Sequence, residues 1–338
     1  MNKVWIIISI ITLVLILLGG LIYGFYLRPI NSRVNVPQDG TVYVVKSGDT
    51  LSKIARNLEK KRIIPSADVL MLYARMNNNG DKLSIGAFKL EKDMRVKDLP
   101  ELFSSKRVMS FLLIVPEGLW LTEIAERLEK IKEGLGKEYL YEVTENISEY
   151  QKRYPMLGIP DISMEGYLFP DTYFLPFNAT GAIVVDLQLK RFVEMSYSEW
   201  EKFNADNGLS FYETLILASL VEGEAKVAAE RADIAGVYIN RLNTKGWKLE
   251  CDATVIYAIG KRKTRVLFSD LKMDSPYNTY SYEGLPQAPI NNPGIKCFEA
   301  ALKPAEHDYF FYFAKGDGSH AFAKDFKEHQ NNIKQYRK

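Results

Sequence analysis

The stretch FYETLILASLVEGEAKVAAERADIAGVYINRL (211–242) predicts two consecutive helices, residues 211–229 and 230–243, separated near Ala229. On a wheel with about 100° per residue, the first helix has an apolar face. That face consists of Leu217, Leu220, Val221 and Ala228. Glu224 falls in the middle of this face, whereas Glu222 points toward the other side. One carboxylate is therefore predicted to face the core or a cleft, and its near neighbour is not.

A carboxylate on an apolar face has a specific chemical meaning. Burial raises its pKa, because the ionised form loses its water, and a protonated glutamic acid near neutral pH can serve as a general acid. The alternative is a structural carboxylate paired with an arginine, such as Arg231 or Arg241. Gly223 either permits close approach of a ligand or is merely tolerated in the helix. The residues alone leave these alternatives open.

Composition restricts the class of protein. The 338 residues are enough for two or three domains, and the net charge of +2 argues against a nucleic-acid binder. Cys251 and Cys297 are too few for a disulfide scaffold and could be paired or free. No metal-ligand spacing and no glycine-rich phosphate loop is present, so neither a metal nor a cofactor is expected.

The N-terminus is strongly apolar. Residues 4–27 contain no charge and are long enough to cross a bilayer, with Trp5, Tyr23 and Tyr26 near the ends of the run. A cleaved signal peptide needs a shorter apolar core and a small-residue cleavage site, and residues 1–27 contain no alanine. We therefore expect residues 1–27 to be an uncleaved anchor. Basic residues flank it on both sides, so charge alone leaves its orientation open.

A strand–turn–helix pattern follows a predicted linker at residues 28–41. TVYVVK (41–46) predicts a strand, SGD a turn, and Asp49 or Thr50 the cap of a helix. The segment VVKSGDTLSKIARNLEK (44–60) aligns with IVPEGLWLTEIAERLEK (114–130), which indicates a duplicated α+β unit or merely shared helix chemistry. Between the copies, residues 83–90 predict a strand and residues 96–103 a short helix.

The remaining segments are predicted more coarsely. Residues 131–163 are expected to form surface helices and loops, and residues 182–205 an amphipathic helix. MEGYLFPDTYFLP (164–176) should be extended or looped, with its aromatic side chains either stacking on sugars or buried. A hairpin (309–314 and 320–323) and a charged helix are expected to end the chain.

Several separated motifs together resemble one family. They are ASLVEGEA with VYINRL, GYLFPDTY (166–173), LECDATVIYAIG (249–260), YNTY (277–280), GLPQAPINNPG (284–294) and GSHAF (318–322). In this order, behind an apolar N-terminus, they are similar to the YceG/MltG-type endolytic murein transglycosylases over nearly the whole chain. The first strand–turn–helix copy resembles a LysM module. The chain departs from the family pattern at Ala253, where a proline is usual, and at Cys251, where a small polar residue is usual.

The resemblance implies an α+β fold with four parts. These are a transmembrane anchor (1–27), a linker (28–41), a small LysM-like α+β subdomain (42–105) and an α+β catalytic domain (106–338). It places the body outside the cytoplasm, attached to the cell membrane by a single helix. Whether the LysM-like unit binds glycan stays open.

The resemblance also implies an activity and a site. Such an enzyme is a lyase that cuts the β-1,4 bond between N-acetylmuramic acid and N-acetylglucosamine in peptidoglycan, leaves 1,6-anhydro ends and terminates growing strands. Peptidoglycan is then the substrate, and cell-wall synthases are candidate partners. The catalytic acid/base of the family is the second glutamate of its E-x-E pair, here Glu224. The expected substrate-binding residues are Asn240, Asp252, Thr254, Tyr277, Asn278, Thr279 and Tyr280.

Two alternatives remain. A hydrolase would use a second carboxylate, Asp252 or Asp171, to activate a water. A non-catalytic glycan-binding scaffold of the cell envelope would not need Glu224 at all. The YNTY side chains could equally well satisfy their own turn, and a structural or surface position is expected for His320 rather than the edge of a cleft.

Overall fold

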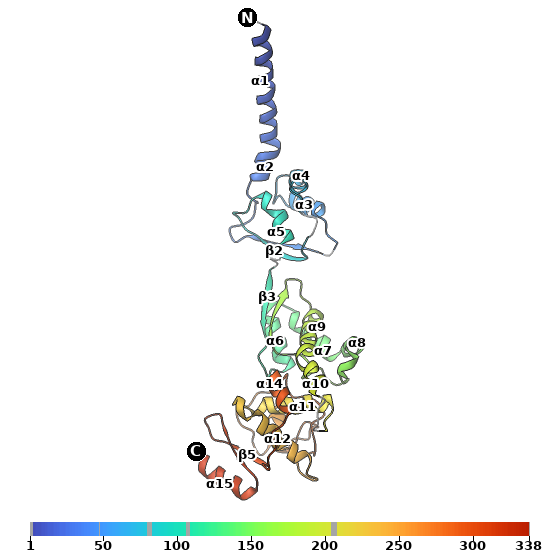
Figure 1. Ribbon diagram of the computed structural model, residues 1–338, viewed down its shortest axis with the longest axis vertical. Coiled ribbons are helices and arrows are strands. Elements are labelled where there is room, and N and C mark those ends of the chain that lie inside the picture. The colour runs from blue at the N-terminus through green and yellow to red at the C-terminus, as the bar shows by residue number, and fades with distance from the viewer. Residues whose placement is uncertain (1–2, 47, 80–82, 106–108, 204–207, 338) are drawn as a thin grey trace. The chain divides into compact units, whose positions relative to one another are not determined.

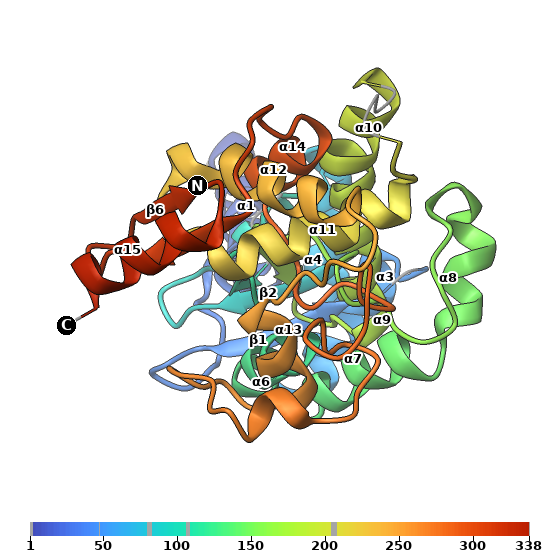
Figure 2. The same ribbon diagram turned by 90° about the horizontal axis from the view of Figure 1, so that it is seen from below.

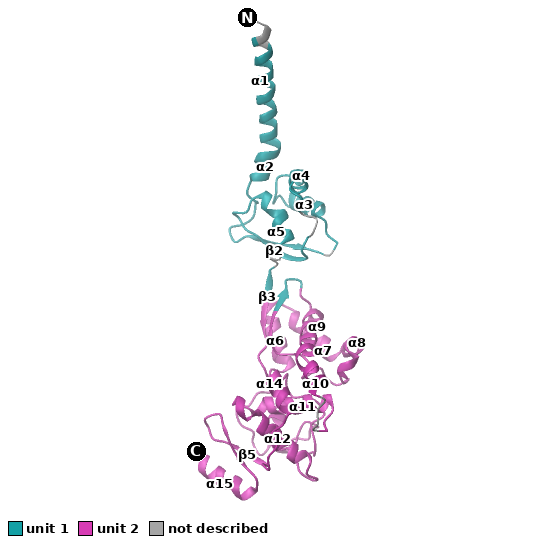
Figure 3. Ribbon diagram, viewed as in Figure 1, with its two compact units in different colours: residues 1–111, 174–178 teal, residues 112–173, 179–338 magenta. Residues whose placement is uncertain are grey.

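The computed structural model describes residues 3–46, 48–79, 83–105, 109–203 and 208–337 (Figure 1). The chain divides into two compact units (Figure 3). The first unit comprises residues 1–111 and 174–178, and the second comprises residues 112–173 and 179–338. It is a mixed α+β protein with small sheets, as the sequence predicts.

The N-terminal segment is one long helix, mostly exposed, with Ile30 buried near its end. It consists of α1 (Lys3–Ile22), a π-helical turn η1 (Tyr23–Leu27) and α2 (Arg28–Asn31). Its stretch Ile7–Asn31 has a mean hydropathy of 2.6, and none of the window that gives this value is buried. By length and composition this helix can cross a membrane, and it runs four residues beyond the predicted end of the anchor.

The first unit is built on an antiparallel pair of strands covered by helices. β1 (Thr41–Val45) pairs with β2 (Gly86–Leu90), from Thr41 opposite Leu90 to Val45 opposite Gly86. Between them lie α3 (Leu51–Lys60) and α4 (Ala67–Met76), and after them η2 (Val96–Asp98) and α5 (Leu99–Ser104).

Local sequence signals account for most of this unit. The Thr50 hydroxyl accepts a hydrogen bond from the Lys53 amide at 3.3 Å, so Thr50 is the cap of α3. Helix α4 was not predicted, although Ser66 caps it in the same way and Leu70 and Ala74 lie on its buried face.

The predicted linker is part of the first unit's core. Ile30, Val34 and Val36 are buried together with residues of β1, β2 and α3. Residues 28–41, predicted to be a linker, thus contribute three apolar side chains to this core, where burial away from water stabilises them.

The second copy of the repeat opens the second unit. β3 (Ser110–Ile114) leads into α6 (Leu121–Ile131), as β1 leads into α3. Gly48 and Gly118 occupy matching turns with φ of 79° and 75°, a conformation that favours glycine. The two strands have different partners, since β3 pairs with β4 (Thr172–Pro176).

The middle of the chain contributes more to the core than expected. Helix α7 (Leu135–Thr144) buries Leu135, Tyr139 and Val143, so residues 131–163 are not simply surface helices. Tyr167 and Leu168 of the GYLFPDTY segment are also buried, which favours the structural interpretation of that loop. The elements here are α7 (Leu135–Thr144), α8 (Ile147–Arg153), η3 (Pro155–Leu157), α9 (Gly181–Phe192), η4 (Val193–Tyr197) and α10 (Ser198–Phe203).

The last part of the chain folds around a buried helix, α11 (Phe211–Glu224). It packs against α12 (Arg231–Leu242) and α14 (Ile295–Leu302), which lie beside it in Figure 2. The predicted hairpin and terminal helix are present as β5 (Phe311–Ala314), β6 (His320–Ala323) and α15 (Phe326–Tyr336). The other elements are η5 (Ala228–Glu230), α13 (Asp252–Ile259) and η6 (Asp270–Lys272).

Candidate active site

Helix α11 ends at Glu224, five residues earlier than predicted. Ala225 turns to an extended conformation (φ −76°, ψ 108°), and Ala228 belongs to η5 instead of the apolar face of the helix. Residues 214–221 are buried on all sides, so the helix runs through the core rather than along a surface. Glu224 is therefore the last residue of a buried helix, partly exposed where the helix stops.

The two glutamates at this end of α11 point to different surroundings, as predicted. A Glu222 carboxylate oxygen accepts a hydrogen bond from the Gly294 amide at 3.0 Å. The Glu224 Oε1 atom accepts from the Ala253 amide at 3.3 Å and from the Cys251 thiol at 3.4 Å. Glu224 thus faces the first turn of α13, whose free amides favour a negative charge.

The environment of Glu224 raises the pKa of its carboxyl above the ordinary value. Burial is the largest cause, and the nearby negative charge of Asp252 adds to it. The hydrogen bonds from Cys251 and Ala253 and the charge of His320 act in the opposite direction. The carboxyl is thus biased toward the protonated form while keeping donors that can stabilise it once ionised.

Gly223 has a packing role that neither sequence interpretation included. A Cβ atom at this position would lie 2.7 Å from the Cβ of Ala253. The glycine therefore lets the end of α11 approach the start of α13, which brings the Ala253 amide to Glu224.

Glu224 opens onto a cavity of about 430 Å³ in the second unit. Its polar lining includes Asp252, whose carboxylate accepts a hydrogen bond from the Tyr280 hydroxyl at 2.7 Å. Of the eight predicted site residues, the cavity lining contains Glu224, Asp252 and Tyr280. The complete lining is Glu224, Arg241, Glu250, Asp252, Tyr280, Phe311, Tyr312, Phe313, Ala314, His320, Phe326, His329 and Ile333.

Two predicted residues lie behind this lining. Thr254 and Thr279 are buried, and their hydroxyl oxygens are 2.9 Å apart. The Thr279 hydroxyl accepts from the Cys251 amide at 3.0 Å, and the Thr254 hydroxyl donates to the Cys251 carbonyl at 2.7 Å. They hold the residue that donates to Glu224 rather than facing the cavity.

Two further residues of the YNTY motif lie outside the cavity lining. The Asn278 amide group donates to the carbonyls of Leu271 and Met273, and its oxygen accepts from the Tyr280 amide at 3.0 Å. Tyr277 packs edge-on against Tyr257, with ring centroids 4.9 Å apart. Neither side chain lines the cavity. The turn interpretation fits Asn278, whereas Tyr277 packs on Tyr257 of α13, outside its own turn.

Asn240 attaches the C-terminal hairpin to α12. Its amide group donates to the carbonyls of His307 and Tyr309, at 2.8 and 2.9 Å. The neighbouring Arg241 donates to the carbonyls of Phe310 and Leu249. Among the described residues no ion pair joins Glu224 to Arg231 or Arg241, so the paired structural carboxylate finds no support.

Residues from the end of the chain were missed in the sequence. His320, expected at a structural or surface position, lines the cavity, and its Nδ1 atom lies 2.8 Å from a Glu230 oxygen. Phe326 and His329 come from α15, a charged helix in which no local pattern marks them. The other predicted second carboxylate, Asp171, is paired with Arg191 at 2.7 Å and lies outside the cavity lining.

Both cysteines are free and buried, so they do not form a disulfide. Cys251 contacts Glu224 as described above. Burial is the largest cause that raises the pKa of the Cys297 thiol, and the nearby Glu222 carboxylate adds to it.

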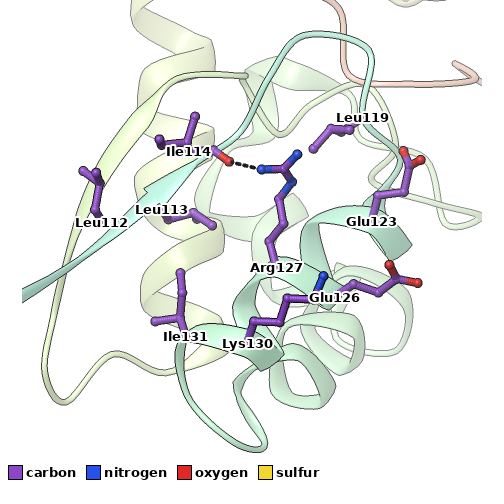
Figure 4. A pocket seen from close by; sticks show the side chains of 9 residues that line it. All are labelled: Leu112, Leu113, Ile114, Leu119, Glu123, Glu126, Arg127, Lys130 and Ile131. Carbon is purple, nitrogen blue, oxygen red and sulfur yellow. Dashed lines mark hydrogen bonds between the residues drawn. The ribbon is translucent and has the colours of Figure 1, made fainter.

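A second cavity in this unit, of about 520 Å³, lies between β3 and α6 (Figure 4). Apolar side chains of β3 face charged side chains of α6, and Arg127 donates to the Ile114 carbonyl at 3.3 Å. Although burial alone would raise the pKa of Glu123, hydrogen bonds from Arg262 lower it. This carboxylate therefore stays ionised and is unsuited to be a general acid.

Comparison with known proteins identifies the family. The model of the YceG-like family matches residues 43–335. This chain belongs to the YceG-like family. A YceG-like relative from Bacillus subtilis, named endolytic murein transglycosylase, is 34% identical over 95% of this chain and 91% of its own length. A relative of the same name from Streptococcus pneumoniae is 27% identical over 99% of this chain, which spans 65% of that protein.

A solved YceG-like structure supports the same assignment. The crystal structure of a putative yceG-like protein from Listeria monocytogenes matches with a TM-score of 0.60 and 28% identity. The match covers 87% of this chain and 99% of that one.

Proposed function

We propose that this YceG-like protein is an endolytic lytic transglycosylase of peptidoglycan, with Glu224 as its catalytic acid and base. The observation that carries the proposal is a carboxyl of raised pKa at the end of a buried helix, open to a cavity lined by polar and aromatic side chains. The relatives named endolytic murein transglycosylase support the same activity. The bond cut is the β-1,4 bond between N-acetylmuramic acid and N-acetylglucosamine.

The mechanism needs one carboxyl group in two protonation states. Protonated Glu224 gives its proton to the glycosidic oxygen as the bond from that oxygen to C1 of N-acetylmuramic acid breaks. The carboxylate then takes the proton of the C6 hydroxyl of the same sugar, whose oxygen bonds to C1. The products are a 1,6-anhydro end and a free hydroxyl on N-acetylglucosamine, and Glu224 is protonated again. The Ala253 amide and the Cys251 thiol stabilise its ionised stage.

Asp252 carries an alternative. It shares the cavity with Glu224, and glycosidases with two carboxylates use the second one to activate water or as a nucleophile. A muramidase-type hydrolase would then release a reducing end. We favour the transglycosylase because Asp252 is already bound to the Tyr280 hydroxyl and because the relatives carry that name.

The first test is cleavage of purified peptidoglycan, followed by mass spectrometry. Glu224→Gln keeps the shape of the side chain but cannot give or take the proton, and we expect activity to fall about a thousandfold. Glu222→Gln, two residues away and outside the cavity lining, is the matched control and should stay active. Equal activity of the parent and Glu224→Gln would refute the proposal, and a parent that binds glycan without cutting it would favour the scaffold.

The remaining parts of the chain support a location at the cell surface. We propose that residues 1–27 anchor the protein in the cell membrane and that residues 106–338 form the catalytic domain outside the cytoplasm. The β1–α3–α4–β2 order fits a LysM-like glycan-binding subdomain at residues 42–105. An enzyme held there would meet nascent strands, so termination of strand growth beside cell-wall synthases is the role we propose.

A further inference from the structure

The hairpin and α15 contribute several aromatic rings to the cavity lining that the proposed proton transfers do not use. Four of them belong to Phe311, Phe313, Phe326 and His329. Phe311 stacks on His329 with ring centroids 5.0 Å apart and planes inclined by 23°. Phe313 lies edge-on to the same imidazole at 6.2 Å, and Phe326 lies 6.1 Å from Phe311. We call these four residues the aromatic wall.

Folding alone does not account for the aromatic wall. All residues of α15 are described, and none of them is buried. Phe326, its first residue, is 60% exposed. An apolar ring costs free energy when it faces water, and exposed apolar surface at a cavity is typical of a ligand-binding site.

The aromatic wall is held in place from behind. Asn240 and Arg241 bind the backbone of residues 307–310, and the Tyr238 hydroxyl lies 2.7 Å from that of Tyr312. The Arg241 guanidinium lies over the Phe311 ring, 5.8 Å from its centroid. Because α12 fixes the hairpin through these contacts, the rings form a preorganised surface.

His329 adds one polar group to this apolar surface. Partial burial and the charge of Arg241 lower the pKa of its imidazole, so the ring is neutral near pH 7. Its Nδ1 atom is buried and has no hydrogen-bond partner among the described residues. Nε2 is therefore the nitrogen left to meet a ligand, and with the proton on Nε2 the ring can donate a hydrogen bond.

We infer that the aromatic wall is a subsite for one N-acetylhexosamine ring of the glycan strand. The apolar face of a pyranose ring would lie against Phe313 and Phe326, and His329 Nε2 would donate to the acetamido carbonyl. This inference rests on the proposed function, because it assumes that a glycan strand enters the cavity of Glu224. A uniformly polar cavity would select hydroxyl groups, whereas this pairing of rings with one donor selects the acetamido group.

The stacking contribution is tested by equilibrium binding to the full-length protein in detergent. Glu224→Gln is the background, so that bound sugar is not cut, and tetra-N-acetylchitotetraose is the probe. Adding Phe326→Ala should weaken binding about tenfold, and Phe326→Trp should keep it. Phe268→Ala, at a residue that is 87% exposed and outside the cavity lining, should have no effect. Equal affinity of the background and Phe326→Ala would overturn the inference.

The acetamido contact is tested with cellotetraose, which has the same linkage but a hydroxyl in place of each acetamido group. His329→Phe keeps a ring beside Phe311 but removes the nitrogen, so the preference for the chitotetraose should fall about tenfold. An unchanged preference would overturn the acetamido contact. Loss of binding to peptide-bearing muropeptides alone would show that the wall binds the peptide and not the sugar.

Failure of the subsite and failure of the proposed function give different results. If the parent cuts peptidoglycan and the Phe326 and His329 variants bind as the background does, the subsite is wrong and the activity stands. If the parent does not cut, the activity itself is wrong. Every variant should unfold at the same temperature as its background protein. This control establishes that changes in binding do not come from misfolding.

Discussion

The groups around Glu224 shift the pKa of its carboxyl in opposite directions. One of the groups that lower this pKa is the Cys251 thiol, at a position where the family pattern has a small polar residue. A thiol is a weaker hydrogen-bond donor than a hydroxyl. Cys251→Ser should therefore stabilise ionised Glu224 and lower its pKa. The first step needs the protonated acid. On raising the pH, the variant should therefore lose activity at a lower pH than the parent does. Profiles of kcat against pH test this, and an alkaline limb that stays in place or moves to higher pH would contradict it.

Gly223 determines how closely α11 and α13 approach each other beside the Glu224 carboxyl. Gly223→Ala places a methyl group against Ala253, and overpacking of this kind costs about 1–3 kcal/mol of unfolding free energy. Adding Ala253→Gly removes the opposing methyl and should restore much of the loss. Chemical denaturation of the two single variants and the double variant measures this coupling. A single variant as stable as the parent would show that the close approach is not required.

At the scale of elements, Glu165 links three segments around the site. Its carboxylate oxygens accept from the Asn292 amide group at 2.7 Å, and from the Leu121 amide and the Tyr257 hydroxyl at 3.2 Å. These contacts connect the loop before β4 with α6, with α13 and with the segment before α14.

The buried Glu165 should make stability depend on pH. Burial raises its pKa to about 8, although the Leu121 and Tyr257 hydrogen bonds oppose this. The unfolded chain releases this proton near pH 4.5, and the folded chain releases it only near pH 8. The unfolding free energy should therefore fall as the pH rises from 4.5 to 8. Glu165→Gln should remove this fall. Denaturation of both proteins at pH 5 and pH 9 tests it, and a parallel pH dependence would contradict it.

Some helices and strands could be predicted from the sequence and others could not. The strand–turn–helix copies and the final hairpin were predictable because their caps, turns and alternation are local. The end of α11 was not predictable, because it lies against the start of α13 through Gly223 and Ala253, a contact that no local pattern encodes. The helical wheel placed Glu224 on one apolar face, but residues 214–221 of α11 are all buried. The prediction of Glu224 as the catalytic residue therefore rests on its motif and not on helical periodicity.

The candidate site as a whole could be predicted only in part. Asp252 and Tyr280 come from the motifs of the family resemblance and line the cavity, whereas Thr254 and Thr279, predicted to bind substrate, lie buried behind that lining. Phe326 and His329 reach the cavity only because α12 holds the hairpin, a contact between segments far apart in sequence. No spacing of residues in the sequence indicates this contact between α12 and the hairpin.

At the scale of the whole molecule, the structure defines where a soluble form should begin. Ile30, Val34 and Val36 belong to the core of the first unit. A form that begins at residue 28 keeps them, whereas one that begins at residue 38 loses three buried side chains worth about 1.5–3 kcal/mol each. We predict that the shorter form has a destabilised first unit. Limited proteolysis and thermal unfolding of the two forms test this, and equal resistance would show that the segment is a free linker.

In the proposed reaction the C6 hydroxyl of N-acetylmuramic acid, and not water, attacks C1 of the same sugar after Glu224 protonates the leaving oxygen. Cleavage of peptidoglycan in water labelled with ¹⁸O, followed by mass spectrometry of the new ends, tests it most directly. We predict anhydro ends that carry no ¹⁸O and that are absent with Glu224→Gln. Reducing ends that contain ¹⁸O would contradict it and would make Asp252 the partner of Glu224 in a hydrolase.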